Sequence, residues 1–296
     1  IHDTGGGIGA WTSAKRTEMS GNIVYYNGFD GPERGHGHGI YVQNELGPKH
    51  LINNIVFDQF GSGIHAYGEK GSVSTLHFDG NIMFNNGSLS ERSGFSRNML
   101  IGGHKPAEGL TVQSNATYYP MAAGGANIIG YNAGCDHLTL LDNYFAGPDA
   151  MTINNCQHLK IQGNSFTGSK PVGMATYDFP ENVVTMKPTG QVTQLHVDRG
   201  EPGRAMLAVF NWDKRSHIRV DVSQIGWQSG QRYLLRNVED FFGDAVKGTY
   251  NGDVVEVPMV GWAKAIPVGR QSAPPSTLPE FGAFVLEMDN TPPEKK

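Results

Sequence analysis

Short phrases in which apolar and polar residues alternate recur through the first 168 residues of the chain. The clearest pair is CDHLTLLDNYFAG, which begins at Cys135, and CQHLKIQGNSFTG, which begins at Cys156; the two align without a gap at a spacing of 21 residues. Alternation with a period of two indicates β-strands, and a fixed repeat of this length indicates similar units stacked on one another. The pattern therefore predicts coils of short strands.

Each repeat contains two kinds of phrase. One carries an asparagine near its start, as in GNIVYYNG, NNIVFDQF, GNIMFNNG and SNATYY, and the phrase before it is GIGAWT, GIYVQN, GIHAYG, NMLIGG, NIIGYN or AMTINN. These make six units of two short strands. We expect an all-β fold, a right-handed parallel β-helix whose coils lie about 4.8 Å apart. The recurring asparagines should stand at a bend and form a ladder of side-chain amides.

The register of the first strands predicts which side chains face inward. Two apolar or small columns do so: Ile8, Ile40, Ile64, Met99, Ile128 and Met151, then Ala10, Val42, Ala66, Ile101, Gly130 and Ile153. The alternate positions face outward and include Trp11, Tyr41, Gln43, His65, Tyr67 and Tyr131. An exposed aromatic patch of this kind indicates a binding site, and rings with planar amides suit sugars. The alternative is that inserts or the second region cover this face.

The pattern changes after Gly168. A proline-containing connector, 169–190, leads into AMLAVFNWD, HIRVDVS, RYLLRNVED, VVEVPM and FGAFVLEMD. These alternating phrases predict a small antiparallel β-sandwich over 191–289, and residues 290–296 form a tail that we expect to be disordered. The segment RAMLAVFNWDKRSHIRVDVSQIG resembles the C-terminal β-sandwich of many glycoside hydrolases. The resemblance implies a structural role, with carbohydrate binding as the alternative.

Composition and charge narrow the range of partners. The chain has 40 glycines, 17% charged residues and a net charge of −5. No basic run suggests nucleic acid, and no apolar run is long enough to span a membrane, so we expect neither partner. The chain opens on IHDTGGGIGAW, which reads as the middle of a coil. We therefore expect further coils or a cap, and any secretion signal, in a segment that precedes Ile1.

The stretch RGHGHGIYVQN is where the chain carries histidines that the repeat does not require, because the equivalent DTGGGI and FGSGI lack them. On an extended segment, His36 and His38 would face the same side, an arrangement common in metal ligation. A third ligand for a divalent metal could come from His65, His104 or Glu45. No cofactor beyond such a metal is indicated.

An acid/base site is the other interpretation. His38 or His65 would transfer a proton, Arg34 or Lys105 would neutralise a substrate carboxylate, and Tyr67 would donate a proton. Trp11, Tyr41, Gln43, His104, Lys105 and Tyr131 are the predicted substrate-binding residues. A hydrolase would instead need two carboxylates across the scissile bond. The acidic residues Glu33, Glu45, Asp58 and Glu69 are available for that role, but the repeat pairs none of them.

Cys135 and Cys156 occupy matching positions in adjacent coils. They are close enough in principle for a disulfide, but buried free thiols are the expected state.

The coil phrases resemble the right-handed parallel β-helix repeat of secreted, carbohydrate-active bacterial proteins such as polygalacturonases, pectate and alginate lyases, and mannuronan epimerases. GHGI at Gly37 echoes the GHG motif of polygalacturonases. Their paired aspartate motifs and the Asp-Pro-His motif of the epimerases are absent from this sequence, so no catalytic set carries over. The resemblance implies a secreted or cell-surface polysaccharide lyase or glycoside hydrolase acting on a polysaccharide or oligosaccharide. The alternatives are a non-catalytic carbohydrate-binding or adhesion module and a metal-dependent enzyme built on His36 and His38.

Overall fold

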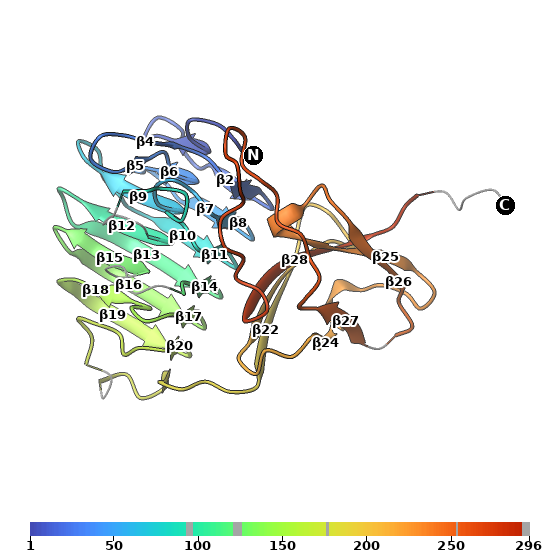
Figure 1. Cartoon of the computed structure of the whole chain (residues 1–296). Coiled ribbons are helices and arrows are strands. Elements are labelled where there is room, and N and C mark those ends of the chain that lie inside the picture. The colour runs from blue at the N-terminus through green and yellow to red at the C-terminus, as the bar shows by residue number, and fades with distance from the viewer. Residues whose placement is uncertain (93–96, 121–125, 176–177, 253, 292–296) are drawn as a thin grey trace. The chain divides into compact units, whose positions relative to one another are not determined.

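The computed structural model describes residues 1–92, 97–120, 126–175, 178–252 and 254–291 and divides the chain into two units. Residues 1–188 form a stack of parallel sheets, and residues 189–296 form an antiparallel unit (Figure 1). The expected fold class, a parallel β-helix followed by a small antiparallel β unit, is confirmed. The tail predicted at 290–296 lies mostly outside the described residues.

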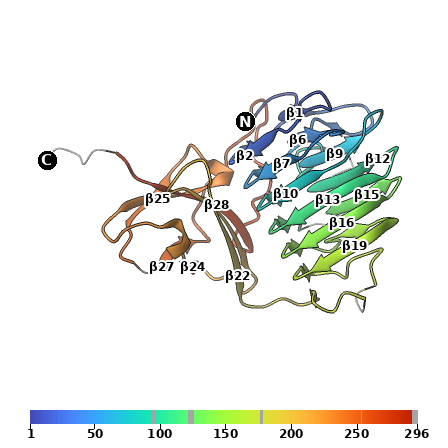
Figure 2. The ribbon, with the colours of Figure 1, turned by 180° about the vertical axis from the view of Figure 1, so that it is seen from behind.

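Three parallel sheets run along the β-helix (Figure 2). Each of the six coils contributes one strand to each sheet, and sheet 3 has a seventh strand at its end. Sheet 1 contains β1 (Ile8–Ala10), β6 (Ile40–Val42), β9 (Ile64–Gly68), β12 (Met99–Gly103), β15 (Asn127–Asn132) and β18 (Thr152–Ile153). Sheet 2 contains β2 (Glu18–Ser20), β7 (Lys49–Ile52), β10 (Leu76–Asp79), β13 (Ala107–Gln113), β16 (Cys135–Leu141) and β19 (Cys156–Gln162). Sheet 3 contains β3 (Ile23–Tyr25), β8 (Ile55–Phe57), β11 (Ile82–Phe84), β14 (Ala116–Tyr118), β17 (Tyr144–Ala146), β20 (Ser165–Thr167) and β21 (Val183–Thr185).

The prediction of two strands per coil is therefore wrong, because each coil has three. The bend between sheets 2 and 3 takes only two residues, so the sequence shows two strands as one continuous phrase. The first residue of this bend has a left-handed backbone in every coil: Gly21, Asn53, Gly80, Ser114, Asp142 and Gly163. Glycine and asparagine adopt this conformation most readily, which explains the recurring Gly-Asn and Asn-Asn pairs.

The second bend residue is the predicted ladder asparagine, and this prediction is confirmed. Asn22, Asn54, Asn81, Asn115, Asn143, Asn164 and Asn182 form an unbroken series in which each amide nitrogen donates to the next amide oxygen at 2.8–2.9 Å. Asn115 Nδ2 also donates to Phe78 O at 3.0 Å. All but the end members are buried. The ladder satisfies buried backbone groups that the tight bend leaves without a strand partner.

The predicted inward columns hold in every coil except the fifth, where they shift by one residue; in the sixth coil Met151 and Ile153 are buried as predicted. Ile8, Ile40, Ile64 and Met99 stack as expected, but Met99 pairs with Asn127 and Ile101 pairs with Ile129. Ile128 thus belongs to the outward column and Gly130 to neither. Gly130 has a left-handed φ of 80° and lies in a bulge, after which Tyr131 pairs with Gly102. A bulge adds one residue to one strand, and simple alternation cannot anticipate it.

Cys135 and Cys156 form a disulfide between paired positions on β16 and β19. The expectation of free thiols is wrong. The pairing register places their Cα atoms 4.3 Å apart, which is within bridging reach.

The second unit contains five antiparallel strands in the order β22 (Gln191–Val197), β23 (Ala205–Asn211), β28 (Phe281–Met288), β25 (Arg232–Asn237) and β26 (Ala245–Thr249). A two-stranded sheet of β24 (His217–Asp221) and β27 (Val254–Pro258) packs with them around an apolar core that includes Leu207, Trp227 and Phe284. Each of the five predicted phrases is a strand. β21, which the sequence placed in the connector, pairs with β20 and extends sheet 3.

Replacing Asn115 by alanine should lower the free energy of unfolding by about 3 kcal/mol, because buried partners above and below lose their hydrogen bonds. Denaturant unfolding followed by circular dichroism measures this change. Gln162→Ala, at an exposed position of sheet 2, is the control and should alter stability by less than about 0.5 kcal/mol. Equal effects of the two substitutions would contradict the role of the ladder.

Candidate functional site

A row of rings follows the outer face of sheet 1 across five coils. Trp11 lies 4.8 Å from Tyr41 between ring centroids, and Tyr41 lies 5.0 Å from His65. The ring centroids of His65 and Tyr67 are 5.4 Å apart, and those of Tyr67 and Tyr131 are 6.2 Å apart. Trp11 is 53% exposed, and the other four side chains are partly buried. These side chains point outward as predicted, because the parallel register places equivalent positions of successive coils side by side.

Two cavities lie along this row. The larger, of about 360 Å³, is lined by Glu33, Arg34, His38, Ser62, His65, Tyr67, Leu100 and Tyr131. The smaller, of about 280 Å³, is lined by the Gly6–Gly9 stretch together with Trp11, Gly37, His38 and Tyr41. His38 lines both cavities, so they adjoin at this residue.

His38 and His65 form a stacked imidazole pair, with centroids 4.0 Å apart and planes 8° from parallel. Burial lowers the pKa of His38 to about 4, assisted by the charge of Arg34. Burial also lowers the pKa of His65 well below its ordinary value, with His38 and Arg34 contributing. Both rings are therefore neutral at neutral pH, because burial disfavours the charged imidazolium form.

The hydrogen bonds of the pair distinguish the two rings. His38 Nδ1 accepts the backbone N–H of Ser62 at 3.0 Å, so a neutral His38 carries its proton on Nε2. His65 Nδ1 is buried without a hydrogen-bond partner in the described part of the chain. An unsatisfied buried imidazole nitrogen is costly, and such atoms are concentrated at functional sites.

His36 belongs to a different environment from His38. It lies on β5 (Gly35–His36), which pairs with β4 (Phe29–Asp30), and its ring stacks on Phe29. His36 Nε2 contacts Glu33 Oε1 at 2.7 Å. Gly37 between the two histidines has a left-handed φ of 83°, so the alternation that would place both rings on one side is interrupted.

Arg34 is the cation at the larger cavity. Its side chain is 36% exposed, and its Nε lies 4.0 Å from Glu33 Oε1. Glu33 is the one carboxylate among the residues that line this cavity. Because Glu33 is already engaged by His36, a guanidinium remains at the cavity with only a distant, exposed counter-charge.

Tyr67 is held by its neighbours rather than by burial alone. Its carbonyl accepts hydrogen bonds from Gln43 Nε2 at 2.9 Å and from Tyr41 Oη at 3.2 Å. Asn132 Nδ2 donates to Tyr67 Oη at 3.3 Å. Gly102 pairs with Tyr67 on one neighbouring strand and with Tyr131 on the other. A Cβ at Gly102 would lie only 2.2 Å from Tyr131 O. The missing side chain lets the two tyrosine rings approach across an intervening coil.

The remaining predicted residues lie at the margin or elsewhere. The ring of His104 meets that of Tyr67 edge-on, with ring centroids 6.0 Å apart. Both His104 and Lys105 are exposed. Of the acidic residues considered for hydrolysis, Asp58 is buried and its Oδ1 accepts from Asn85 and Ser88. Asp58 is therefore a structural residue.

Sequence reasoning missed Lys49, which is fully buried under the start of the row. Its Nζ donates to the carbonyl oxygens of Ala10, Trp11 and Gln43 at 2.6–3.1 Å, so its three protons are all used. Burial lowers its pKa. Ser62 and Leu100 were also missed, because a backbone N–H and an apolar cavity wall leave no chemical signature in a sequence.

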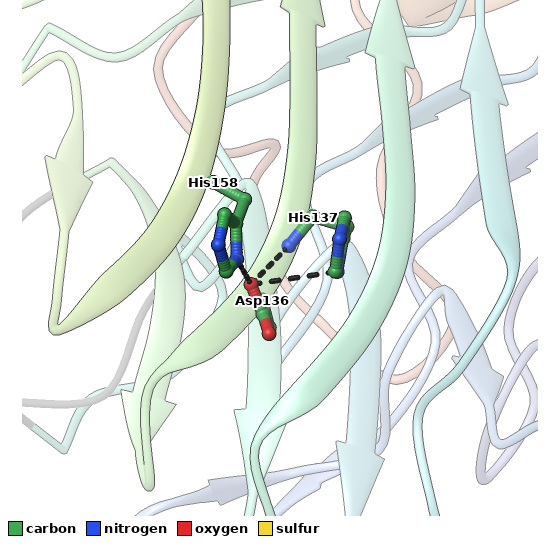
Figure 3. A group of neighbouring side chains, drawn as sticks. All are labelled: Asp136, His137 and His158. Carbon is green, nitrogen blue, oxygen red and sulfur yellow. Dashed lines mark hydrogen bonds and ion pairs between the residues drawn. The ribbon is translucent and has the colours of Figure 1, made fainter.

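Within the described residues, one group of metal-ligating side chains brings three ligand atoms within 4.8 Å of one another, and it is Asp136, His137 and His158 on sheet 2 (Figure 3). The predicted metal pair, His36 and His38, does not assemble such a group among these residues.

Also among the described residues, no helix has the length and apolar character needed to cross a membrane. Comparisons with protein-family models, curated proteins and solved structures give no significant match to this chain. The site must therefore be interpreted from its own geometry.

Lowering the pH from 6.5 to 4 should destabilise the protein. His38 has a lower pKa in the folded chain than in the unfolded chain, so the unfolded chain binds more protons between these two pH values. The stability that the neutral His38 contributes is therefore lost as the pH falls. Urea unfolding at several pH values measures the slope. His38→Gln should flatten it, and Gln162→Ala, which removes no titratable group, should leave it unchanged. A wild-type slope retained in His38→Gln would contradict the assignment.

Proposed function

We propose that the protein binds an acidic polysaccharide or oligosaccharide along the outer face of sheet 1 and cleaves it by β-elimination. The observation that carries this proposal is the neutral His38–His65 pair in a cavity that also presents Arg34 and Tyr67.

The row of rings supports glycan binding. Trp11, Tyr41, Tyr67 and Tyr131 offer flat apolar surfaces on which the C–H faces of sugar rings stack, and Gln43 provides an amide at the same face. The two cavities along the row extend the surface beyond what a single sugar would fill. An elongated, partly exposed ligand suits this arrangement better than an enclosed small molecule.

The cavity provides the groups that β-elimination requires. The guanidinium of Arg34 would face the carboxylate of a uronic acid and make the proton on the adjacent carbon more acidic. His65 is the candidate base through Nε2, because Nδ1 is buried and a neutral imidazole protonated on Nδ1 has its lone pair on Nε2. The bond from the neighbouring carbon to the glycosidic oxygen then breaks, a carbon–carbon double bond forms, and Tyr67 Oη or His38 Nε2 donates a proton to the leaving oxygen. Atoms and charge balance without a further reactant.

A hydrolytic mechanism has less support. It needs two carboxylates, and the lining of the larger cavity includes Glu33 alone.

A secreted or cell-surface location is part of the same proposal. The disulfide between Cys135 and Cys156 supports it, because disulfides persist mainly in oxidising compartments.

Non-catalytic glycan binding is the second candidate function. The observation that favours it is that His38 Nδ1 is already occupied by a backbone N–H and His65 Nδ1 is buried. A binding module would need the rings only as surfaces.

Incubation with a panel of uronate-containing polysaccharides tests the proposal. We expect a rise in the ultraviolet absorbance of unsaturated uronate ends, and His65→Gln should reduce the rate at least about a hundredfold, as expected for loss of a general base. His77→Gln is the matched control, because His77 also stacks on a histidine, His50, but on sheet 2.

The outcomes separate the two candidates. Binding that depends on Trp11 and Tyr41, without any unsaturated product, would establish the binding module instead of the lyase. New reducing ends without unsaturation would indicate hydrolysis. Neither binding nor product with any acidic glycan would refute the proposal as a whole.

A further inference from the structure

We propose that Asp136, His137 and His158 form a zinc site on sheet 2, separate from the cavities on sheet 1. The three residues come from two neighbouring strands, β16 and β19. The proposal concerns an ion held on the outer surface of the β-helix and does not depend on any activity of sheet 1.

Asp136 Oδ1 lies between the two imidazoles (Figure 3). It is 2.6 Å from His158 Nδ1 and 3.4 Å from His137 Nδ1. Two ligands on a common tetrahedral zinc ion are about 3.3 Å apart when their bonds are about 2.0–2.1 Å long. The two Asp136–histidine distances fall on either side of this spacing, and all three ligand atoms lie within 4.8 Å of one another, so side-chain rotations would bring them onto one ion.

The backbone holds both histidines in an unusual conformation. His137 has a φ of 51° and His158 a φ of 47°, and in the coil before them Gly109 has a φ of 62° at the same position of the register. Glycine occupies this left-handed position freely, whereas a histidine does so at some cost. Thr75, in register with Gly109 one coil earlier, is also left-handed with a φ of 52°, so this conformation belongs to the bend itself and the argument for an ion rests on the side-chain contacts.

A second histidine pair on the same sheet shows what stacking alone produces. His50 and His77 stack at 4.7 Å with planes 19° apart, and His137 and His158 stack at 4.7 Å with planes 18° apart. The coil spacing thus accounts for stacking in both pairs. The difference is Asp136, whose carboxylate contacts both rings of the second pair, and the left-handed backbone.

The ligand types and surroundings favour zinc. Imidazole nitrogens with a carboxylate oxygen suit zinc, whereas magnesium and calcium prefer oxygen ligands alone. Glu108 Oε1 lies 3.0 Å from His137 Nδ1 and is the candidate fourth ligand, with water as the alternative. The side chains of His137 and His158 are 62% and 65% exposed, so an ion can reach them.

The disulfide stiffens the site. Cys135 directly precedes Asp136, and Cys156 lies two residues before His158, so the Cys135–Cys156 bridge joins the same two strands that carry the ligands. Holding the strands together reduces the ordering that ion binding would otherwise require.

Calorimetric titration of the tag-free, oxidised full chain with zinc alone tests the proposal. We expect one zinc ion per chain at neutral pH. Asp136→Asn and His158→Gln should each weaken binding at least about tenfold.

The matched control is the His50→Gln, His77→Gln double variant, which removes an equally stacked pair and should leave zinc affinity unchanged. Far-UV circular dichroism verifies that each variant is folded. Failure of the wild-type chain to bind zinc would overturn the proposal. So would an equal loss of affinity in the control, because it would show that binding follows surface histidines in general.

Discussion

Parallel pairing between successive coils is the interaction on which the rest of this structure depends. Each coil buries its apolar face only against the coils above and below, so no coil is stable alone. Backbone hydrogen bonds set the spacing between coils, and the ladder from Asn22 to Asn182 carries the pairing through the bends where strands end. One asparagine amide per coil thus keeps the bend between sheets 2 and 3 in a common register along the stack.

That register converts sequence repeats into columns of neighbouring side chains. His38 precedes β6 and His65 lies on β9, yet their rings are in contact; His137 and His158 come together on sheet 2 in the same way. In each pair the coil spacing brings the two rings into contact, and the neighbouring groups determine the protonation and ligand-binding properties of the pair. Arg34 and burial surround the first pair, whereas Asp136 bridges the second in solvent. One scaffold therefore supports two chemically distinct histidine pairs.

Departures from the repeat shape the cavity on sheet 1. Gly37 separates His36 from His38, Gly130 introduces the bulge that brings Tyr131 outward, and Gly102 leaves room between Tyr67 and Tyr131. Each is a local change of one residue in an otherwise regular stack. Lys49 shows the complementary case, because its buried ammonium group holds three carbonyls where the strands of sheet 1 end. These features position the site, and none is visible as a motif.

The sequence by itself determined the parallel β-helix, the asparagine ladder, five of the strands of the second unit and the outward position of Trp11, Tyr41, His65 and Tyr67, because alternation and repetition are properties of residue order. It did not determine the third strand of each coil, the register of Ile128, the disulfide, the separation of His36 from His38 or the Asp136 cluster. Those depend on backbone conformations at single residues such as Gly37 and Gly130, and on contacts between coils. The tertiary structure alone decided them, because a left-handed residue or a bulge breaks the alternation of side chains within its own segment.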